Sequence, residues 1–80
     1  MARQQLVLVT AVGCHFCAHA REVLESLGLG AHEIDVESDE ARALARSGVP
    51  LAFLPVLWDG SRVVGYGRVS ERRLRRELAL

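Results

Sequence analysis

Hydrophobic residues fall along the chain in short runs and stripes that predict alternating strands and helices. The run at 6–9, Leu-Val-Leu-Val, is continuous and is typical of a strand buried on both faces. Between residues 14 and 27, apolar residues recur every three or four positions, which predicts one apolar face of a helix. Gly28 and Gly30 are expected to end this helix. The apolar face consists of Cys17, Ala20, Leu24 and Leu27.

The middle of the chain predicts a second strand and a shorter helix. Residues 31–36 have the alternation of a strand, and Ser38 is a suitable N-cap for a helix that ends at Ser47-Gly48. A strand, a helix and a strand joined by short links form a right-handed βαβ unit.

The last third of the chain predicts a hairpin followed by a helix. Residues 56–58 and 62–64 flank Asp59-Gly60, a strong hairpin signal, and the glycines in 65–67 are expected to loosen the end of the second strand. Ser70 is the predicted N-cap of the last helix. The whole order is β-α-β-α-β-β-α. It predicts an α/β fold: a four-stranded mixed sheet with helices on both faces, in one domain over residues 1–80.

Composition and charge narrow the function classes. Ten acidic residues balance ten basic ones, so the net charge is zero and we expect neither nucleic acid nor a membrane surface as a partner. All the basic residues are Arg, which excludes Schiff-base chemistry and P-loop phosphate binding because both require Lys. We see no targeting segment and no run long enough to span a membrane, so we expect a cytoplasmic protein.

The candidate chemistry lies where the first strand gives way to the first helix. The only two cysteines of the chain stand there three positions apart, as Cys14-His15-Phe16-Cys17. The positive end of a helix stabilises a thiolate, and a thiolate is the nucleophile in thiol–disulfide exchange. We expect Cys14 to be the exposed, attacking thiol and Cys17 to resolve the mixed disulfide. A protonated His15 would favour the Cys14 thiolate, and Phe16 would offer an apolar contact to a partner.

Two alternatives to a redox dithiol remain open at this point. The first is a structural zinc site, which needs two further ligands, usually a second closely spaced pair. His15, His19 and His32 form no such pair. The second alternative is a pair of inert, buried thiols. We therefore assign no metal ligand and favour the redox dithiol.

Over residues 5 to 79 the chain resembles the glutaredoxin-like branch of the thioredoxin superfamily. The resemblance is carried by the dithiol after the first strand, by Leu54-Pro55-Val56-Leu57 at the start of the third strand, and by the hairpin and terminal helix that follow. It implies a thioredoxin-like fold and a cis Leu54-Pro55 bond against the dithiol. The substrate contacts that we expect are His15, Phe16, Leu54, Pro55, Gly67 and Arg68.

The chain departs from the glutaredoxin pattern at positions linked to glutathione. Ala11 stands where glutaredoxins usually have Lys, and Phe53 stands where they have Thr before Val-Pro. In glutaredoxins an acidic pair opens the last helix, but the corresponding residues here, around Val69-Ser70, are not acidic. We therefore expect weak glutathione binding, although Arg68 has the chemistry to bind a carboxylate.

The sequence thus predicts a small dithiol oxidoreductase, with Cys14 and Cys17 as catalytic residues and no bound cofactor. Its substrate would be a disulfide-containing protein or a small-molecule disulfide. Its reductant would be glutathione as co-substrate or a thioredoxin-reductase-like flavoprotein. The alternative hypothesis is a non-catalytic thioredoxin-fold binding module that holds a metal or an iron–sulfur cluster through the two cysteines.

Overall fold

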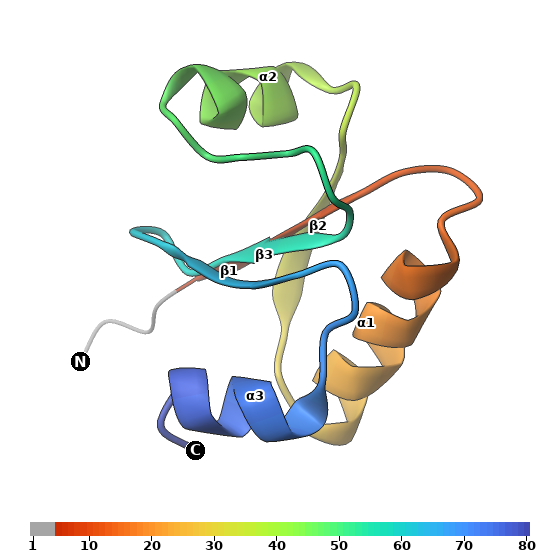
Figure 1. The fold of residues 1–80 in the computed structure, drawn as a ribbon, viewed down its shortest axis with the longest axis vertical. Coiled ribbons are helices and arrows are strands. Elements are labelled where there is room, and N and C mark those ends of the chain that lie inside the picture. Colours follow the sequence, from red (N-terminus) through yellow and green to blue (C-terminus); the bar gives the residue numbers. More distant parts are fainter. Residues whose placement is uncertain (1–4) are drawn as a thin grey trace.

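A computed structural model describes residues 5–80 of the chain (Figure 1). Four strands form one mixed sheet in the order β2-β1-β3-β4. The strands are β1 (Leu6–Thr10), β2 (Ala31–Asp35), β3 (Val56–Trp58) and β4 (Val63–Tyr66). The helices are α1 (His15–Ser26), α2 (Asp39–Arg46) and α3 (Glu71–Glu77). The predicted order of elements and the four-stranded mixed sheet are confirmed.

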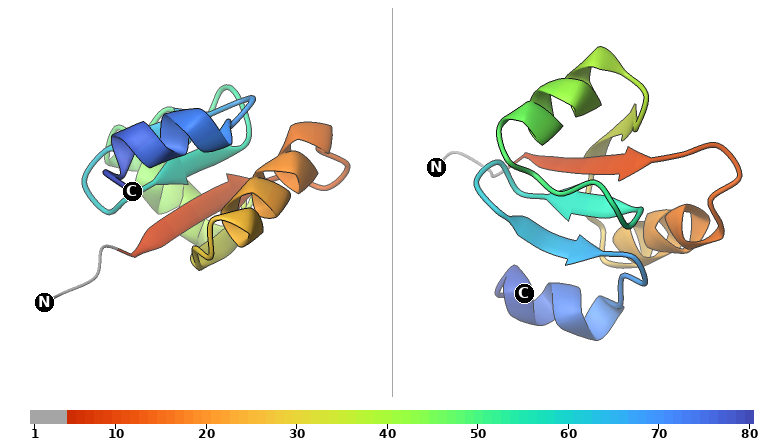
Figure 2. Two further views of the ribbon diagram at one scale, coloured as in Figure 1. Left: turned by 90° about the horizontal axis from the view of Figure 1, so that it is seen from below. Right: turned by 45° about the horizontal axis from the view of Figure 1, so that its top comes forward.

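Strand β1 lies inside the sheet and pairs with a neighbour on each side. It runs parallel to β2, with Val9 opposite Ile34, and antiparallel to β3, with Val9 also opposite Val56. Strand β4 then pairs antiparallel with β3 at the edge, and Figure 2 (right) shows β1, β3 and β4 side by side. The parallel pair arises because α1 carries the chain back to the start of the sheet between β1 and β2.

One face of the sheet is covered by α1 and α3, and the other by α2 (Figure 1). Side chains alternate between the two faces along each strand. Thus Leu8 and Leu57 pack on the α1 and α3 side, whereas Val9 and Val56 pack on the α2 side. The run at 6–9 therefore supplies side chains to the hydrophobic core on each face of the sheet, as its continuous hydrophobicity predicts.

The starts of α2 and α3 are fixed by serine caps at the predicted places. Ser38 Oγ accepts a hydrogen bond from the Ala41 amide at 3.2 Å, and Ser70 Oγ accepts one from the Arg73 amide at 3.1 Å. Each cap satisfies an amide that has no partner within its own helix. The cap at Ser70 places Leu74 in the core on the α1 and α3 face.

The second strand of the hairpin differs from the prediction. The glycines in 65–67 were expected to loosen it, but Gly65 pairs with Leu57 and Tyr66 pairs with Val56, so β4 continues to Tyr66. Gly65 is buried beneath α3, where a Cβ would meet the Leu74 side chain of that helix at 3.7 Å. Pairing with β3 and cover from the last helix hold this segment extended despite the weak strand propensity of glycine.

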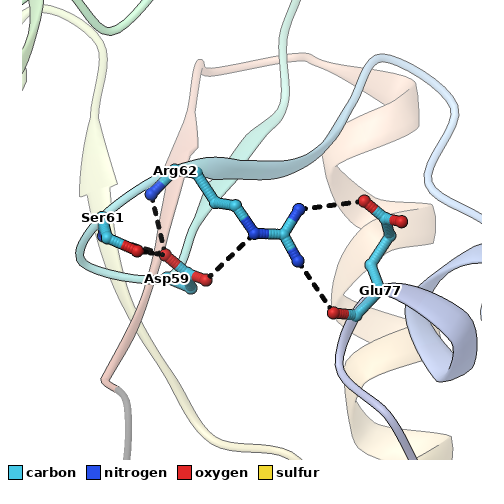
Figure 3. Close-up of polar contacts among 4 residues, drawn as sticks. All are labelled: Asp59, Ser61, Arg62 and Glu77. Atoms are coloured by element: carbon cyan, nitrogen blue, oxygen red, sulfur yellow. Dashed lines mark hydrogen bonds and ion pairs between the residues drawn. The ribbon is translucent and has the colours of Figure 1, made fainter.

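A buried carboxylate holds the hairpin turn between β3 and β4 (Figure 3). Asp59 Oδ1 accepts hydrogen bonds from the Ser61 amide, the Ser61 hydroxyl and the Arg62 amide, at 2.8, 2.9 and 2.8 Å. Asp59 is only 5% exposed, so these donors replace the water that the carboxylate loses. Gly60 sits in this turn with a φ of +102°, a conformation that side chains disfavour.

Arg62 connects the same turn to the end of α3 (Figure 3). Its guanidinium donates to Glu77 Oε1 at 3.0 Å and to the Glu77 carbonyl at 2.9 Å, and it lies 3.8 Å from Asp59 Oδ2. Burial would raise the pKa of Asp59, but the amide and hydroxyl hydrogen bonds and the Arg62 charge together hold this pKa below its ordinary value.

Among residues 5–80, we find no helix that combines the length and the apolar character needed to cross a bilayer.

Replacing Asp59 should destabilise the protein. We expect Asp59→Ala to lower the free energy of unfolding by about 1–3 kcal/mol at pH 7, because it leaves the Ser61 and Arg62 amides of the turn without their acceptor. Since the pKa of Asp59 is depressed in the folded state, its contribution is present above the unfolded pKa and is lost as the pH falls through the folded value. The difference between variant and wild type should therefore shrink below about pH 4 in urea titrations.

Asp39→Ala is the matched control for this experiment. The Asp39 side chain is 99% exposed, and its single ion pair within residues 5–80 is with Arg42, so its loss should cost less than about 1 kcal/mol. Equal costs for the two variants, or an Asp59→Ala cost that does not change with pH, would contradict the role assigned to Asp59.

Candidate functional site at the dithiol end of the sheet

Four segments that carry candidate residues meet at one end of the sheet. The register places Thr10 opposite Asp35, and Val9 opposite Val56. The loop after β1 and the chain entering β3 therefore lie at the same end, and the end of β4 joins them because Tyr66 pairs with Val56. Figure 2 (right) shows the start of α1 at this end as well. We call it the dithiol end.

Cys14 is the N-cap residue of α1. Gly13 directly before it has a φ of +76°, so the tight turn from strand to helix requires a residue without a side chain there. The Cys14 amide donates to the Ala11 carbonyl, and Cys14 Sγ accepts a hydrogen bond from the Cys17 amide at 3.2 Å. An amide directed at this sulfur would stabilise a negative charge on it when the cysteine is reduced.

Cys17 lies one turn further along the helix and is completely buried, whereas Cys14 is only partly covered. The Cα atoms of the two residues are 5.2 Å apart, and a disulfide joins their sulfur atoms. The structure therefore brings together the two predicted catalytic residues in the oxidised state. Solvent and partners can reach only the Cys14 side of the pair.

The two residues between the cysteines point outward. His15 is exposed and Phe16 is 46% exposed, and their ring centroids lie 6.1 Å apart. The first turn of α1 contains no carboxylate, so nothing in that turn offsets the positive end of the helix. Both side chains are available to an approaching substrate, and their contact with one stays a prediction.

The Leu54-Pro55 bond is cis, as the family resemblance implies. The Gly67 amide donates to the Pro55 carbonyl at 2.8 Å, so two predicted substrate residues from separate segments are neighbours. Within residues 5–80 the backbone of Leu54 enters neither a strand pairing nor a loop hydrogen bond. Its peptide groups are therefore available to an extended chain.

Arg68 lies between β4 and α3, one residue beyond Gly67. Its side chain is exposed, and none of the ion pairs among the described residues involves it. The six predicted substrate residues thus lie in segments that reach the dithiol end. Their contact with a substrate stays a prediction.

Two features of this end do not follow from the sequence pattern. The first is a polar cluster: Arg21 donates to both carboxylate oxygens of Glu33, at 2.8 and 2.6 Å, and the buried Thr10 hydroxyl donates to the same carboxylate at 3.1 Å. The Arg21 hydrogen bond is the main reason that the pKa of Glu33 is lowered, against a smaller opposing effect of burial. The cluster ties α1 to β1 and β2.

The second feature is apolar. The side chains of Val12, Phe53 and Tyr66 are exposed by 96%, 70% and 56%, all in segments that reach the dithiol end. The sequence signal for Phe53 was its substitution for the Thr of the family pattern. Val12 and Tyr66 carried no signal, because exposure depends on neighbours distant in sequence.

Across residues 5–80, no group of three or more His, Cys, Asp or Glu side chains is close enough to hold an ion. In the alternative hypothesis, Cys14 and Cys17 from each of two chains could supply four ligands to a shared cluster.

Comparisons with known proteins identify the family. The family model described as Glutaredoxin matches residues 6–63, which is most of the chain and includes both cysteines. The structure is similar to the crystal structure of glutaredoxin 1 from Francisella tularensis complexed with cacodylate, with a TM-score of 0.63 and 18% sequence identity. This match covers 94% of the present chain and 92% of the other, and at that identity it speaks for the fold. A search of curated proteins found no match. The chain belongs to the glutaredoxin family, with a Cys-x-x-Cys pair that supports a glutaredoxin-like redox function.

Proposed function

We propose that the protein is a thiol–disulfide oxidoreductase that reduces disulfides with the Cys14–Cys17 dithiol. The observation that carries the proposal is the asymmetry of the pair. Cys14 caps the start of α1 and is accessible, whereas Cys17 is fully buried one turn further in and within disulfide distance. One sulfur is thus placed to meet a substrate, and the other to act only on its neighbour.

The reaction consists of two exchanges. The Cys14 thiolate attacks one sulfur of a substrate disulfide, forming a Cys14–substrate mixed disulfide and releasing the other substrate sulfur as a thiolate that takes up a proton. Cys17 then loses its proton and attacks Cys14 Sγ, which releases the second substrate thiol. The substrate gains two electrons and two protons, and the protein is left with the Cys14–Cys17 disulfide.

The surroundings of Cys14 favour the first step. The helix start and the Cys17 amide both stabilise negative charge on Cys14 Sγ. The unpaired backbone of Leu54 offers hydrogen bonds to the chain that carries the substrate disulfide. Pro55 lacks an amide hydrogen, and the Pro55 carbonyl already accepts a hydrogen bond from Gly67. The backbone groups left for a substrate are therefore those of Leu54, and we assign this segment to positioning the substrate.

An external reductant completes the cycle. Two molecules of glutathione, which leave as the glutathione disulfide, or a thioredoxin-reductase-like flavoprotein would supply the two electrons. The protein's own residues need no bound cofactor for either exchange. Parallel assays in which oxidised protein is offered each reductant separately would identify the one it uses.

The two cysteines should differ sharply in reactivity. In reduced protein at pH 7, we expect iodoacetamide to label Cys14 at least about ten times faster than Cys17, because only Cys14 is accessible at the helix start. Cys17→Ser should accumulate a mixed disulfide with substrate, and Cys14→Ser should accumulate none. Mass spectrometry of labelled and trapped species measures both.

Three results would count against the proposal. Faster labelling of Cys17 would reverse the roles of the cysteines. Failure of the reduced wild type to reduce any disulfide, protein or small, would remove the activity. Stoichiometric zinc or an iron–sulfur chromophore that survives dialysis would favour the binding module instead.

Glutathione should bind weakly. We expect a dissociation constant weaker than about 1 mM for S-methylglutathione, which cannot exchange with the disulfide, and the oxidised protein, because Ala11 supplies no charge and Val69-Ser70 supply no carboxylates. Ala11→Lys should strengthen binding by about two- to fivefold, the effect of one exposed ion pair. Isothermal titration calorimetry of both proteins measures the difference.

Val12→Lys is the control for this substitution, since it adds the same charge at the adjacent and almost fully exposed position. Equal gains from the two lysines would point to general charge attraction. Low-micromolar binding by the wild type would show that Arg68 and the neighbouring amides suffice, and the expectation of weak binding would then be wrong.

A further inference from the structure

Exposed apolar side chains gather at the dithiol end of the molecule. Five large hydrophobic side chains among residues 5–80 are exposed. Val12 and Phe16 flank the dithiol in sequence, Phe53 lies just before the cis peptide, and Tyr66 ends β4. The fifth, Leu80, follows α3 and belongs to none of the segments that reach the dithiol end. A concentration of exposed apolar groups in one region is typical of a contact surface.

Two of these side chains line an apolar groove. Its volume is about 340 Å³, and its lining is Pro50, Ala52, Phe53, Val63 and Tyr66. The lining contains no charged residue, and the Tyr66 hydroxyl is the single polar group on its side chains. A volume near the lower end of the roughly 300–1,000 Å³ range of ligand pockets suits one or two apolar side chains better than a cofactor.

The groove is continuous with the site that would hold a substrate. Phe53 directly precedes Leu54, whose backbone is unpaired, and Tyr66 directly precedes Gly67, which donates to the Pro55 carbonyl. Val63 also packs against the core on the α2 side, so the groove opens on that side of the edge strand β4. A chain that pairs with Leu54 would therefore have the groove beside it.

We propose that this groove binds an apolar or aromatic side chain that flanks the reactive cysteine of a protein substrate. The proposal rests on the proposed function and specifies its substrate class: protein disulfides in extended, apolar segments. Such a segment would pair with Leu54 while one of its side chains enters the groove between Phe53 and Tyr66. Burial of that side chain would supply binding energy that a small disulfide does not offer.

The chemistry of the surface favours this occupant over glutathione. Glutathione carries two carboxylates and an ammonium group, and no charged residue of the groove would pair with them. The exposed Phe53 stands where the family pattern has a hydroxyl group, which makes the substrate face of this chain more apolar. Val12 and Phe16, on either side of Cys14 in the sequence, are also exposed and offer an apolar partner further contacts.

Two matched peptides test the proposal. Each is an extended ten-residue peptide with one cysteine linked as a mixed disulfide to a chromophoric aryl thiol. Leu and Phe flank the cysteine in one peptide, and Ser and Asn flank it in the other. Stopped-flow absorbance gives the second-order rate constant with the reduced protein. We expect the apolar peptide to react at least about ten times faster, a factor that partial burial of one large side chain provides.

Variants locate the source of the preference. Phe53→Ser and Tyr66→Ser should each reduce the ratio between the two peptides severalfold, and the double variant should bring it close to one. Leu80→Ser is the matched control, because Leu80 and Tyr66 are both 56% exposed and Leu80 lies at the other end of α3. It should leave the ratio unchanged. Circular dichroism confirms that each variant folds.

Several outcomes would overturn the inference while leaving the proposed function intact. They are equal rates for the two peptides, a preference that survives in the double variant, and a preference that Leu80→Ser also removes. A wild-type dimer in light scattering that Phe53→Ser dissociates would assign the groove to a second copy of the chain. Failure to react with both peptides and with bis(2-hydroxyethyl) disulfide would instead refute the oxidoreductase function itself.

Discussion

The antiparallel pairing of β3 with β1 is the constraint on which the site depends. Because Val56 lies opposite Val9, the chain that enters β3 must arrive at the end of the sheet where β1 leaves it. The dithiol follows β1 and the cis peptide precedes β3, so two segments about forty residues apart in sequence meet there. The β3–β4 hairpin extends the same register and brings Gly67 to Pro55. Val9 and Val56 also share the core under α2, so packing and pairing specify one register together.

Within that frame, the difference between the two cysteines arises from helix geometry. A residue at the N-cap lies outside the first turn, whereas the residue three positions later faces the sheet. Cys14 is thereby left within reach of a partner while Cys17 is sealed in the core. The same geometry directs the Cys17 amide at Cys14 Sγ. The stabilisation of a thiolate therefore needs no lysine nearby, and this chain has none.

Local patterns made most of the fold and the dithiol predictable. The helix caps at Ser38 and Ser70 and the turn at Asp59-Gly60 depend on side chains within a few residues of the backbone they satisfy, so short windows of sequence contain them. The continuation of β4 through Gly65 was missed because it depends on cover from α3 and on pairing with Leu57. The cluster of Thr10, Arg21 and Glu33 was missed for the same reason: it joins three elements whose adjacency only the tertiary fold creates.

The two ends of the sheet differ in how their side chains are satisfied. At the hairpin end, Asp59, Arg62 and Glu77 form a polar network that fixes the turn and anchors the end of α3. At the dithiol end, by contrast, the Leu54 backbone has no hydrogen bond within residues 5–80, and Phe53 and Tyr66 leave apolar surface in water. Neither the unpaired Leu54 backbone nor the exposed apolar side chains stabilise an isolated chain, since unpaired backbone and exposed apolar surface favour association. The unsatisfied groups thus concentrate at the end of the sheet where a substrate would complete them.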